Sequence, residues 1–488
     1  MSRPRALFSR RAALVLVCAA IACTPSLAED SLAPSDLIGA WSGGVVLPTG
    51  ELEVEVVLDH EADGWAGTID IPSQGAAGLA LAVEHVDGAL TMRIRGVPGE
   101  PTFRVETTGL EAPIDALEGA FRQGPLATTF ALRRGGLAPP PRPQDPKPPF
   151  PYRTREVRIP GEVEQVGVLT LPAGDGPYAG VLLVSGSGPQ NRDGEVMDHR
   201  PFRLWADVLA RRGLAVLRLD DRGVGASTGD HDAATTRDFA ADAQAALAWL
   251  TRQPEIDPER VGAIGHSEGG LIVPMALEAA PDLGAFAVLL APTAVPGGEV
   301  LARQTELLLR AGGAPPALVE RERQRIEQTN AMVVSDRTLE ELERDLRAFA
   351  EEQARASGLI DEAQIADVVE LTVRQAASPW YRFFLRHDPA GPLSRLTVPT
   401  LVVWGERDLQ VDPAQNLPAA ATALAAAPTR DLTLRVLPGL NHLLQPAVTG
   451  ASSEYATIET TIAPDALRAV ADWLAERVLG EASGSPNN

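Results

Sequence analysis

Short, predominantly apolar runs, separated by longer stretches of helical periodicity, constrain the fold of this chain most. The runs lie at 181–184, 215–219, 261–264, 287–290 and 401–403, and helical periodicity between and after them is clearest at 239–250 and 466–474. Apolar runs of this kind are typical of strands buried on both faces, as in a parallel sheet. The pattern therefore predicts an α/β architecture, with function expected at the carboxyl ends of the strands.

A proline-dense segment divides the chain. Residues 139–151 read PPPRPQDPKPPFP, which favours extended polyproline II structure and excludes a helix or a central strand. We expect a module at 29–138 before this linker and a larger domain at 152–480 after it. Alternating apolar residues around 52–58 and 90–94 predict that the module is a small antiparallel β-barrel or sandwich.

The larger domain carries an insertion. From about residue 297 to 385, Glu, Arg, Ala and Leu dominate and no strand pattern is present. We interpret this stretch as a helical cap over the end of the sheet, because active-site lids are the usual role of such insertions. A lateral helical domain unrelated to the site is the alternative. The last residues, 481–488, are expected to be a disordered tail.

The N-terminus has the layout of a secretory signal peptide at 1–28. Four arginines (Arg3, Arg5, Arg10 and Arg11) precede an apolar run at 12–23, and a small-residue cleavage site follows at 26–28. The run is too short to span a bilayer, so no integral membrane span is predicted. We expect a periplasmic or secreted protein, exported by the Sec or the twin-arginine route. A buried N-terminal helix and a lipoprotein attached at Cys23 are the alternatives.

Composition excludes several functions. Removal of the leader takes away four arginines and no acidic residue, so the formal net charge moves from −22 to −26. Such a surface repels phosphate backbones, and no nucleic-acid partner is expected. Both cysteines, Cys18 and Cys23, lie in the leader, and Lys147 in the linker is the only lysine. A cysteine nucleophile, a disulfide and a Ser–Lys dyad are therefore excluded from the processed chain.

The nucleophile motif Gly-x-Ser-x-Gly occurs twice, around Ser227 and around Ser267. A nucleophile elbow needs a strand that runs directly into the serine and a helix that begins directly after it. Ser267 meets both demands, since the apolar run at 261–264 leads in and a helical pattern leads out. Ser227 meets neither, and we interpret it as a turn residue.

A serine needs a base, and the base needs an acid that orients it. Of the two histidines after Ser267, His442 follows a predicted strand at 432–437, where a base must lie, whereas His387 precedes a strand. For the acid, Asp408 is favoured because it follows the strand at 400–403. The neighbours Glu406 and Asp412 stay open as alternatives.

The oxyanion of a tetrahedral intermediate needs preorganised N–H donors. We expect the backbone N–H of Glu268, directly after the nucleophile, and the backbone N–H of Ser187, in the glycine-rich loop after the first apolar run. The pair Asp220–Asp221 after the second run is interpreted as a structural turn near the site. No cofactor and no metal site is predicted.

Several ordered motifs resemble bacterial α/β-hydrolases of the EstD-type carboxylesterase and serine aminopeptidase-like group. They are SGSGPQNRDG at 185–194, DDRGVGASTG at 220–229, GHSEGG at 265–270, SPWYRFFLRHDP at 378–389, GERDLQV at 405–411 and LPGLNHLLQ at 437–445. The resemblance covers about 152–480 and implies Ser267, Asp408 and His442 as the triad, acting on short acyl esters. One departure is Leu444, where the group commonly has Phe.

These observations predict an exported serine hydrolase that cleaves small carboxylic esters through an acyl-enzyme on Ser267. A peptidase or amidase with the same triad is the nearest alternative, because the fold does not separate the two. A catalytically inactive envelope binding protein is the alternative from another class, disfavoured because all three triad residue types are present in order. Partner proteins are not predicted.

Overall fold

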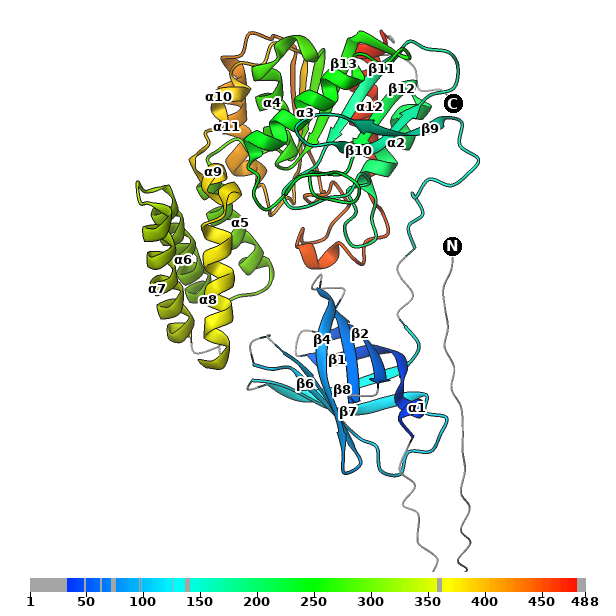
Figure 1. The fold of residues 1–488 in the computed structure, drawn as a ribbon, viewed down its shortest axis with the longest axis vertical. Coiled ribbons are helices and arrows are strands. Elements are labelled where there is room, and N and C mark those ends of the chain that lie inside the picture. Colours follow the sequence, from blue (N-terminus) through cyan, green and yellow to red (C-terminus); the bar gives the residue numbers. More distant parts are fainter. Residues whose placement is uncertain are drawn as a thin grey trace, which may run out of the picture.

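The computed structural model describes residues 33–47, 50–61, 64–71, 76–95, 97, 99–124, 126–136, 141–357 and 362–480. Two sheets organise these residues, a closed barrel formed by β1–β8 and an eight-stranded sheet formed by β9–β16. Figure 1 shows the barrel in blue and cyan and the second sheet in green to orange, with helices around it. The α/β architecture expected of the larger domain is present, preceded by an antiparallel β domain.

The N-terminal β domain is a barrel, which settles the choice between barrel and sandwich. Its strands pair as antiparallel neighbours, and β1 also pairs with β8, which closes the barrel. The buried side chains alternate along the strands as the sequence predicted, for example Val54, Val56 and Leu58. The strands are β1 (Gly39–Leu47), β2 (Gly50–Glu61), β3 (Gly64–Ile71), β4 (Ala76–Val86), β5 (Ala89–Ile94), β6 (Thr102–Glu106), β7 (Ala116–Gln123) and β8 (Leu126–Arg134), preceded by α1 (Pro34–Leu37).

The second sheet has the strand order β16-β15-β14-β13-β11-β12-β10-β9. All pairings among β11–β16 are parallel. At the other edge, β10 pairs antiparallel with both β12 and β9. The mostly parallel sheet predicted from the apolar runs is confirmed. Its strands are β9 (Arg153–Ile159), β10 (Gln165–Leu171), β11 (Tyr178–Val184), β12 (Leu214–Leu219), β13 (Ile256–His266), β14 (Phe286–Leu290), β15 (Thr400–Gly405) and β16 (Leu432–Leu437).

Both faces of the sheet are covered by helices, which is why the central strands are apolar throughout. Leu182 and Val184 of β11 pack into one core with α3 and α4, whereas Val181 and Leu183 pack into a second core with α2 and α12. The helices around the sheet are α2 (Pro201–Arg211), α3 (Thr236–Leu250), α4 (Gly269–Ala279), α10 (Ala390–Leu393), α11 (Pro413–Ala425) and α12 (Pro464–Leu474), with short turns at Pro281–Leu283, Ser452–Glu454 and Ala475–Leu479.

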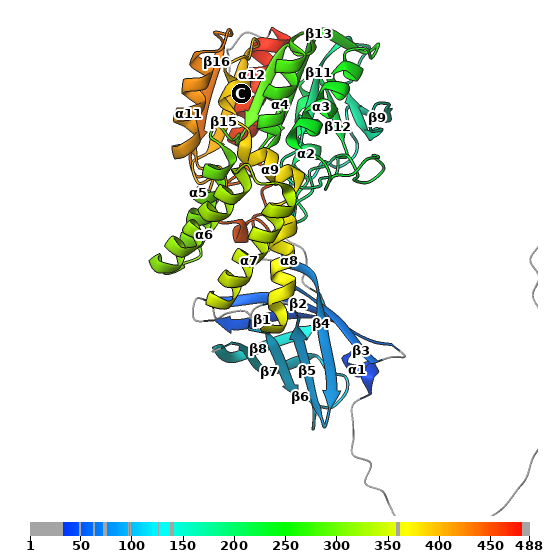
Figure 2. The same ribbon diagram turned by 60° about the vertical axis from the view of Figure 1, so that its left-hand side comes forward.

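The insertion between β14 and β15 is helical, as predicted. It comprises α5 (Gly297–Ala311), α6 (Pro316–Val334), α7 (Leu339–Ser357), α8 (Glu362–Ala376) and α9 (Pro379–Arg386). A separate core that includes Val333, Leu346 and Val369 joins α6, α7 and α8. In Figures 1 and 2 these three helices project from the end of the hydrolase domain at which α9 joins it. We call α5–α9 the cap.

The described part of the proline-rich segment, 141–151, contains neither helix nor strand, and it is bonded to the larger domain. The Arg142 guanidinium donates to the carbonyl oxygens of Met197, Ala456 and Ile458 at 2.9–3.0 Å. Prolines supply no N–H, so side chains carry the polar contacts of this strap.

The expected signal peptide at 1–28 and the expected tail at 481–488 lie outside the described residues. Across the part of the chain that the structure describes, no helix is both long and apolar enough for a bilayer crossing.

Candidate active site

Ser267 lies on the turn between β13 and α4. Its backbone has φ +57°, a left-handed conformation that residues other than glycine rarely adopt. Glycines on both sides permit the tight turn: a Cβ on Gly265 would lie 2.1 Å from the Gly269 carbonyl oxygen, and a Cβ on Gly269 would lie 2.3 Å from the Val184 carbonyl oxygen. This is the strand–turn–helix geometry of a nucleophile elbow.

His442 and Asp408 form a buried pair. The Nδ1 atom of His442 lies 2.8 Å from Oδ2 of Asp408, and the two residues are 4% and 1% exposed. The other Asp408 oxygen, Oδ1, accepts hydrogen bonds from the backbone N–H groups of Gln410 and Val411 at 2.9 and 2.8 Å. Because a carboxylate only accepts, Nδ1 of His442 carries a proton and Nε2 is the nitrogen left to act as a base.

The alternatives to these two residues are engaged elsewhere. Glu406 accepts from the backbone N–H of Gly439 at 2.8 Å, and Asp412 accepts from the N–H of Ala414 and from Arg303. His387 stacks on Phe383 with 5.2 Å between ring centroids, and it does not line the cavity that holds Ser267. Asp408 and His442 are therefore the acid and base candidates that the geometry favours.

Ser267 and His442 line one cavity of about 480 Å³. The cavity is also lined by the glycine-rich loop that carries Ser187, by the cap and by the loop at 443–462. Among the described residues, no hydrogen bond joins the Ser267 hydroxyl to the His442 ring. Catalytic hydrogen bonds of this kind often tighten only when substrate binds. The remaining walls are largely apolar and include Phe202, Trp205, Leu290, Val300, Leu301, Trp380, Phe384, Leu443, Leu444 and Ile462.

The two expected oxyanion donors lie beside the nucleophile. The loop that carries Ser187 passes so close that a Cβ on Gly186 would lie 3.0 Å from the Cβ of Ser267. Ser187 and Glu268 both line the same cavity. Within the described part of the chain neither backbone N–H donates to a protein acceptor. Both groups are thus available for a substrate oxygen, which is the requirement of an oxyanion hole.

The side chain of Glu268 connects the elbow to the cap. Its Oε1 accepts from Nε1–H of Trp380 in α9 at 2.8 Å and from the Thr236 hydroxyl at the start of α3 at 2.7 Å. Burial raises the pKa of the Glu268 carboxyl, and the residue is 1% exposed. From the sequence we expected a role only for the backbone of Glu268, and none for Trp380 in the motif SPWYRFFLRHDP.

His266, directly before the nucleophile, braces the base. Burial, together with the neighbouring His442, lowers the pKa of His266 to about 3, so the ring is neutral at ordinary pH. Its Nε2–H donates to the backbone carbonyl of His442 at 2.9 Å. The two rings lie 4.9 Å apart. Its position in GHSEGG was visible in the sequence, but its contact depends on the distant His442 loop.

The second Gly-x-Ser-x-Gly motif has no place in this site. The Ser227 hydroxyl donates to the Asp220 carbonyl at 2.8 Å and accepts from the N–H of Val166 at 2.9 Å. These bonds join the turn after β12 to β10. No cluster of three or more metal-ligating side chains occurs among the residues that the structure describes.

The model of the alpha/beta hydrolase family matches residues 181–449, which include every residue of the candidate triad. The chain belongs to this family. Esterase EstD of Thermotoga maritima is 27% identical to the hydrolase over 245 residues, which cover 50% of each chain. Esterase FrsA of Escherichia fergusonii is 32% identical over 142 residues, 29% of the hydrolase and 32% of FrsA. The resemblance to EstD-type esterases drawn from the motifs is confirmed.

The hydrolase thus spans half or less of the length of these curated relatives. Solved structures with a similar chain path include the Pyrococcus furiosus esterase Pf2001, with a TM-score of 0.40 and 17% identity over 70% of the hydrolase and all of that chain. The alpha/beta hydrolase GrgF from Penicillium matches with a TM-score of 0.41 and 17% identity, covering 68% of the hydrolase and 100% of GrgF.

Proposed function

We propose that the hydrolase cleaves carboxylic esters of short acyl chains through an acyl-enzyme on Ser267. The observation that carries the proposal is the buried His442–Asp408 pair, which lines one cavity with a serine held at positive φ. The similarity to the esterases EstD and FrsA supports an ester as the substrate.

The proposed reaction starts when Nε2 of His442 takes the proton of the Ser267 hydroxyl as its oxygen attacks the ester carbonyl. Asp408 stabilises the imidazolium that forms, since its carboxylate lies 2.8 Å from Nδ1. The N–H groups of Ser187 and Glu268 stabilise the oxyanion. His442 then protonates the departing alcohol. In the second half, His442 activates a water that releases the acid from Ser267.

The acidic residues that line the cavity favour an ester over a substrate with a free amine. An aminopeptidase needs an acceptor for the substrate ammonium group. Among the described lining residues the acids are Glu195 and Glu268. Glu195 already accepts from Asn191 and Arg200. Oε1 of Glu268 accepts from Trp380 and Thr236, whereas Oε2 has no hydrogen-bond partner among the described residues. Burial raises the pKa of the Glu268 carboxyl, which disfavours the charged form that an ammonium group needs.

A substrate profile tests this proposal. Initial rates would be measured on p-nitrophenyl esters from acetate to laurate and on aminoacyl p-nitroanilides, with Ser267→Ala as the blank. We expect kcat/KM on the short esters to exceed that on every anilide by at least a hundredfold. Faster turnover of the anilides would replace the esterase by a peptidase. If neither the esters nor the anilides are turned over, the result would favour a catalytically inactive binding protein.

We also propose that the hydrolase is exported after cleavage behind Ala28. The order of arginines, apolar run and small residues supports this, as does the absence of cysteine after residue 28. N-terminal sequencing of the protein from the periplasm or medium should begin at Glu29. An intact leader on cytosolic protein would contradict export. Changing Arg10 and Arg11 to lysine should block export only if the twin-arginine route is used.

A further inference from the structure

Asp221, the second residue after β12, bonds to both ends of the loop that carries Ser187. Its Oδ1 accepts from the Ser185 hydroxyl at 2.6 Å, and its Oδ2 accepts from the backbone N–H of Gln190 at 2.9 Å. Its own backbone N–H donates to the Gln190 carbonyl at 3.1 Å. One side chain from a neighbouring strand therefore fixes where this turn begins and where it ends.

The turn from Ser185 to Gln190 needs such a tether. It contains neither helix nor strand, and Gly188 has φ +85°, so the backbone has no regular hydrogen-bond ladder of its own. The turn also lies against the nucleophile, as the close approach of Gly186 to Ser267 shows. A displacement of about 1 Å would move the Ser187 N–H away from the position of an oxyanion, where hydrogen bonding is steeply distance-dependent.

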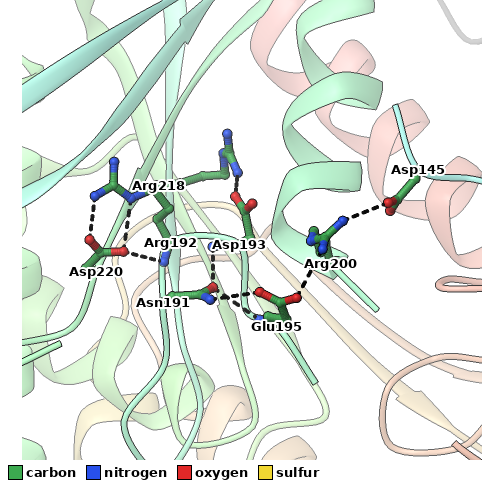
Figure 3. Close-up of polar contacts among 8 residues, drawn as sticks. All are labelled: Asp145, Asn191, Arg192, Asp193, Glu195, Arg200, Arg218 and Asp220. Carbon is green, nitrogen blue, oxygen red and sulfur yellow. Dashed lines mark hydrogen bonds and ion pairs between the residues drawn. The ribbon is translucent and has the colours of Figure 1, made fainter. Parts of the chain in front are cut away.

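The preceding residue, Asp220, continues the tether along the same loop. Its Oδ1 accepts from the backbone N–H of Arg192 at 2.8 Å and from Nε of Arg192 at 3.0 Å. Figure 3 shows this pair beside the ion pair of Asp193 with Arg218, which anchors the next loop residue to β12. The two aspartates after β12 thus hold the loop in successive steps, with Asp221 on the part nearest the nucleophile.

Asp221 lines a small cavity of about 50 Å³, which is also lined by Gln165, Arg222, His231 and Asp242. Burial raises the pKa of Asp221 to about 7, and the charges of Glu268 and Asp242 add to the rise, while the bonds from Ser185 and Gln190 oppose it. Both protonation states retain the tether: a protonated Oδ1 donates to the Ser185 oxygen, and Oδ2 still accepts from Gln190.

We propose that Asp221 is a positioning residue for the oxyanion hole, which holds the Ser187 N–H in place by tying Ser185 to Gln190. This inference rests on the proposed esterase function. It assigns to the DDRG segment a role in transition-state stabilisation that is separate from the triad.

The test compares Asp221→Ala, Asp221→Asn and Ser185→Ala in the full chain. For each variant, kcat and KM on p-nitrophenyl butyrate would be measured. The inhibition constant of an alkyl trifluoromethyl ketone would be measured as well, because the serine oxygen adds to the ketone carbonyl and forms a tetrahedral oxyanion. Asp221→Ala should lower kcat at least tenfold with KM within threefold, and the ketone should bind more weakly by a similar factor. Ser185→Ala should lose about threefold in kcat.

Asp221→Asn should retain most of kcat, because its amide oxygen accepts from Gln190 while its NH₂ donates to Ser185. Asp242→Ala is the matched control, since Asp242 lines the same cavity but bonds to Arg222 rather than to the loop. Equal kcat in Asp221→Ala and Asp242→Ala, or an effect on KM alone, would overturn the inference. If Asp221→Ala does not fold, an unchanged kcat in Ser185→Ala overturns it. Failure of the esterase proposal itself is distinct, because the parent would then not turn over the ester.

Discussion

The indole N–H of Trp380 donates to Oε1 of Glu268 at 2.8 Å, so a cap residue is bonded to the residue that follows the nucleophile. Trp380 also stacks on Phe384, with ring centroids 5.2 Å apart, and both rings line the cavity. The cap therefore contributes a wall of the cavity and at the same time fixes the side chain of an expected oxyanion donor.

Replacement of Trp380 by Phe removes the N–H and keeps an aromatic ring beside Phe384. A side-chain hydrogen bond contributes about 0.5–1.5 kcal/mol. We expect kcat to fall roughly five- to tenfold, with a smaller change in KM. Trp473→Phe is the control, because its indole N–H bonds to Thr433 away from the cavity. Equal kinetics in the two variants would show that the Trp380–Glu268 bond does not support catalysis.

Replacement of Asp408 by Asn preserves the shape of the side chain and removes the charge that orients His442. The amide would favour the wrong imidazole tautomer, so kcat should fall by about 10³-fold or more while the protein stays folded. Steady-state kinetics with circular dichroism checks this. Glu406→Gln is the matched control and should stay within threefold of the parent, since Glu406 bonds to Gly439. A larger loss of kcat in Glu406→Gln than in Asp408→Asn would show that Glu406, and not Asp408, orients His442.

The sequence predicted those parts of the site that depend on local order. Ser267 could be chosen over Ser227 because a strand leads directly into it and a helix leads out. The acid could not be chosen with certainty, since Glu406, Asp408 and Asp412 lie within seven residues. The geometry favours Asp408, because the N–H groups of Gln410 and Val411 bind its Oδ1 while its Oδ2 lies 2.8 Å from Nδ1 of His442.

Contacts between segments that are far apart in the chain could not be predicted from the sequence. Trp380 and Glu268 are 112 residues apart, and Ser185 and Asp221 are 36 apart. The antiparallel edge strands β9 and β10 were also missed, although the parallel strands were placed. The exposed side chains of β9, such as Arg153 and Arg155, give it none of the apolar run that marks a central strand.

The elevated pKa of Asp221 predicts a stability effect with a defined sign. The unfolded chain loses this proton near the ordinary value of 3.8, whereas the folded chain loses it at about 7. Between these values the folded state binds the extra proton, so the free energy of unfolding falls as pH rises. From pH 5 to 8 the parent should lose about 2.5 kcal/mol more than Asp221→Asn, at ~1.4 kcal/mol per pKa unit. Urea titrations would measure this, and parallel pH profiles would contradict it.

The strap after the barrel should support one wall of the cavity. Arg142 bonds to the carbonyl groups of Ala456 and Ile458, in the loop that also carries the lining residues Tyr455 and Ile462. Arg142→Ala should therefore lower the free energy of unfolding by about 2 kcal/mol and raise KM several-fold, with little change in kcat.

Arg153→Ala is the matched control for the strap, since Arg153 is exposed and makes one longer bond, 3.3 Å to the carbonyl of Gly174. Urea titration and ester kinetics on the two variants would separate them. If Arg142→Ala behaves as Arg153→Ala does, the strap has no part in shaping the cavity.

The most direct test of the account is the mass of the intact protein after reaction with a fluorophosphonate. The parent and Ser227→Ala should each gain one phosphonyl group, and peptide mapping should place it on Ser267. Ser267→Ala should gain none while keeping the circular dichroism spectrum of the parent. Labelling of Ser267→Ala at the rate of the parent would show that Ser267 is not the nucleophile.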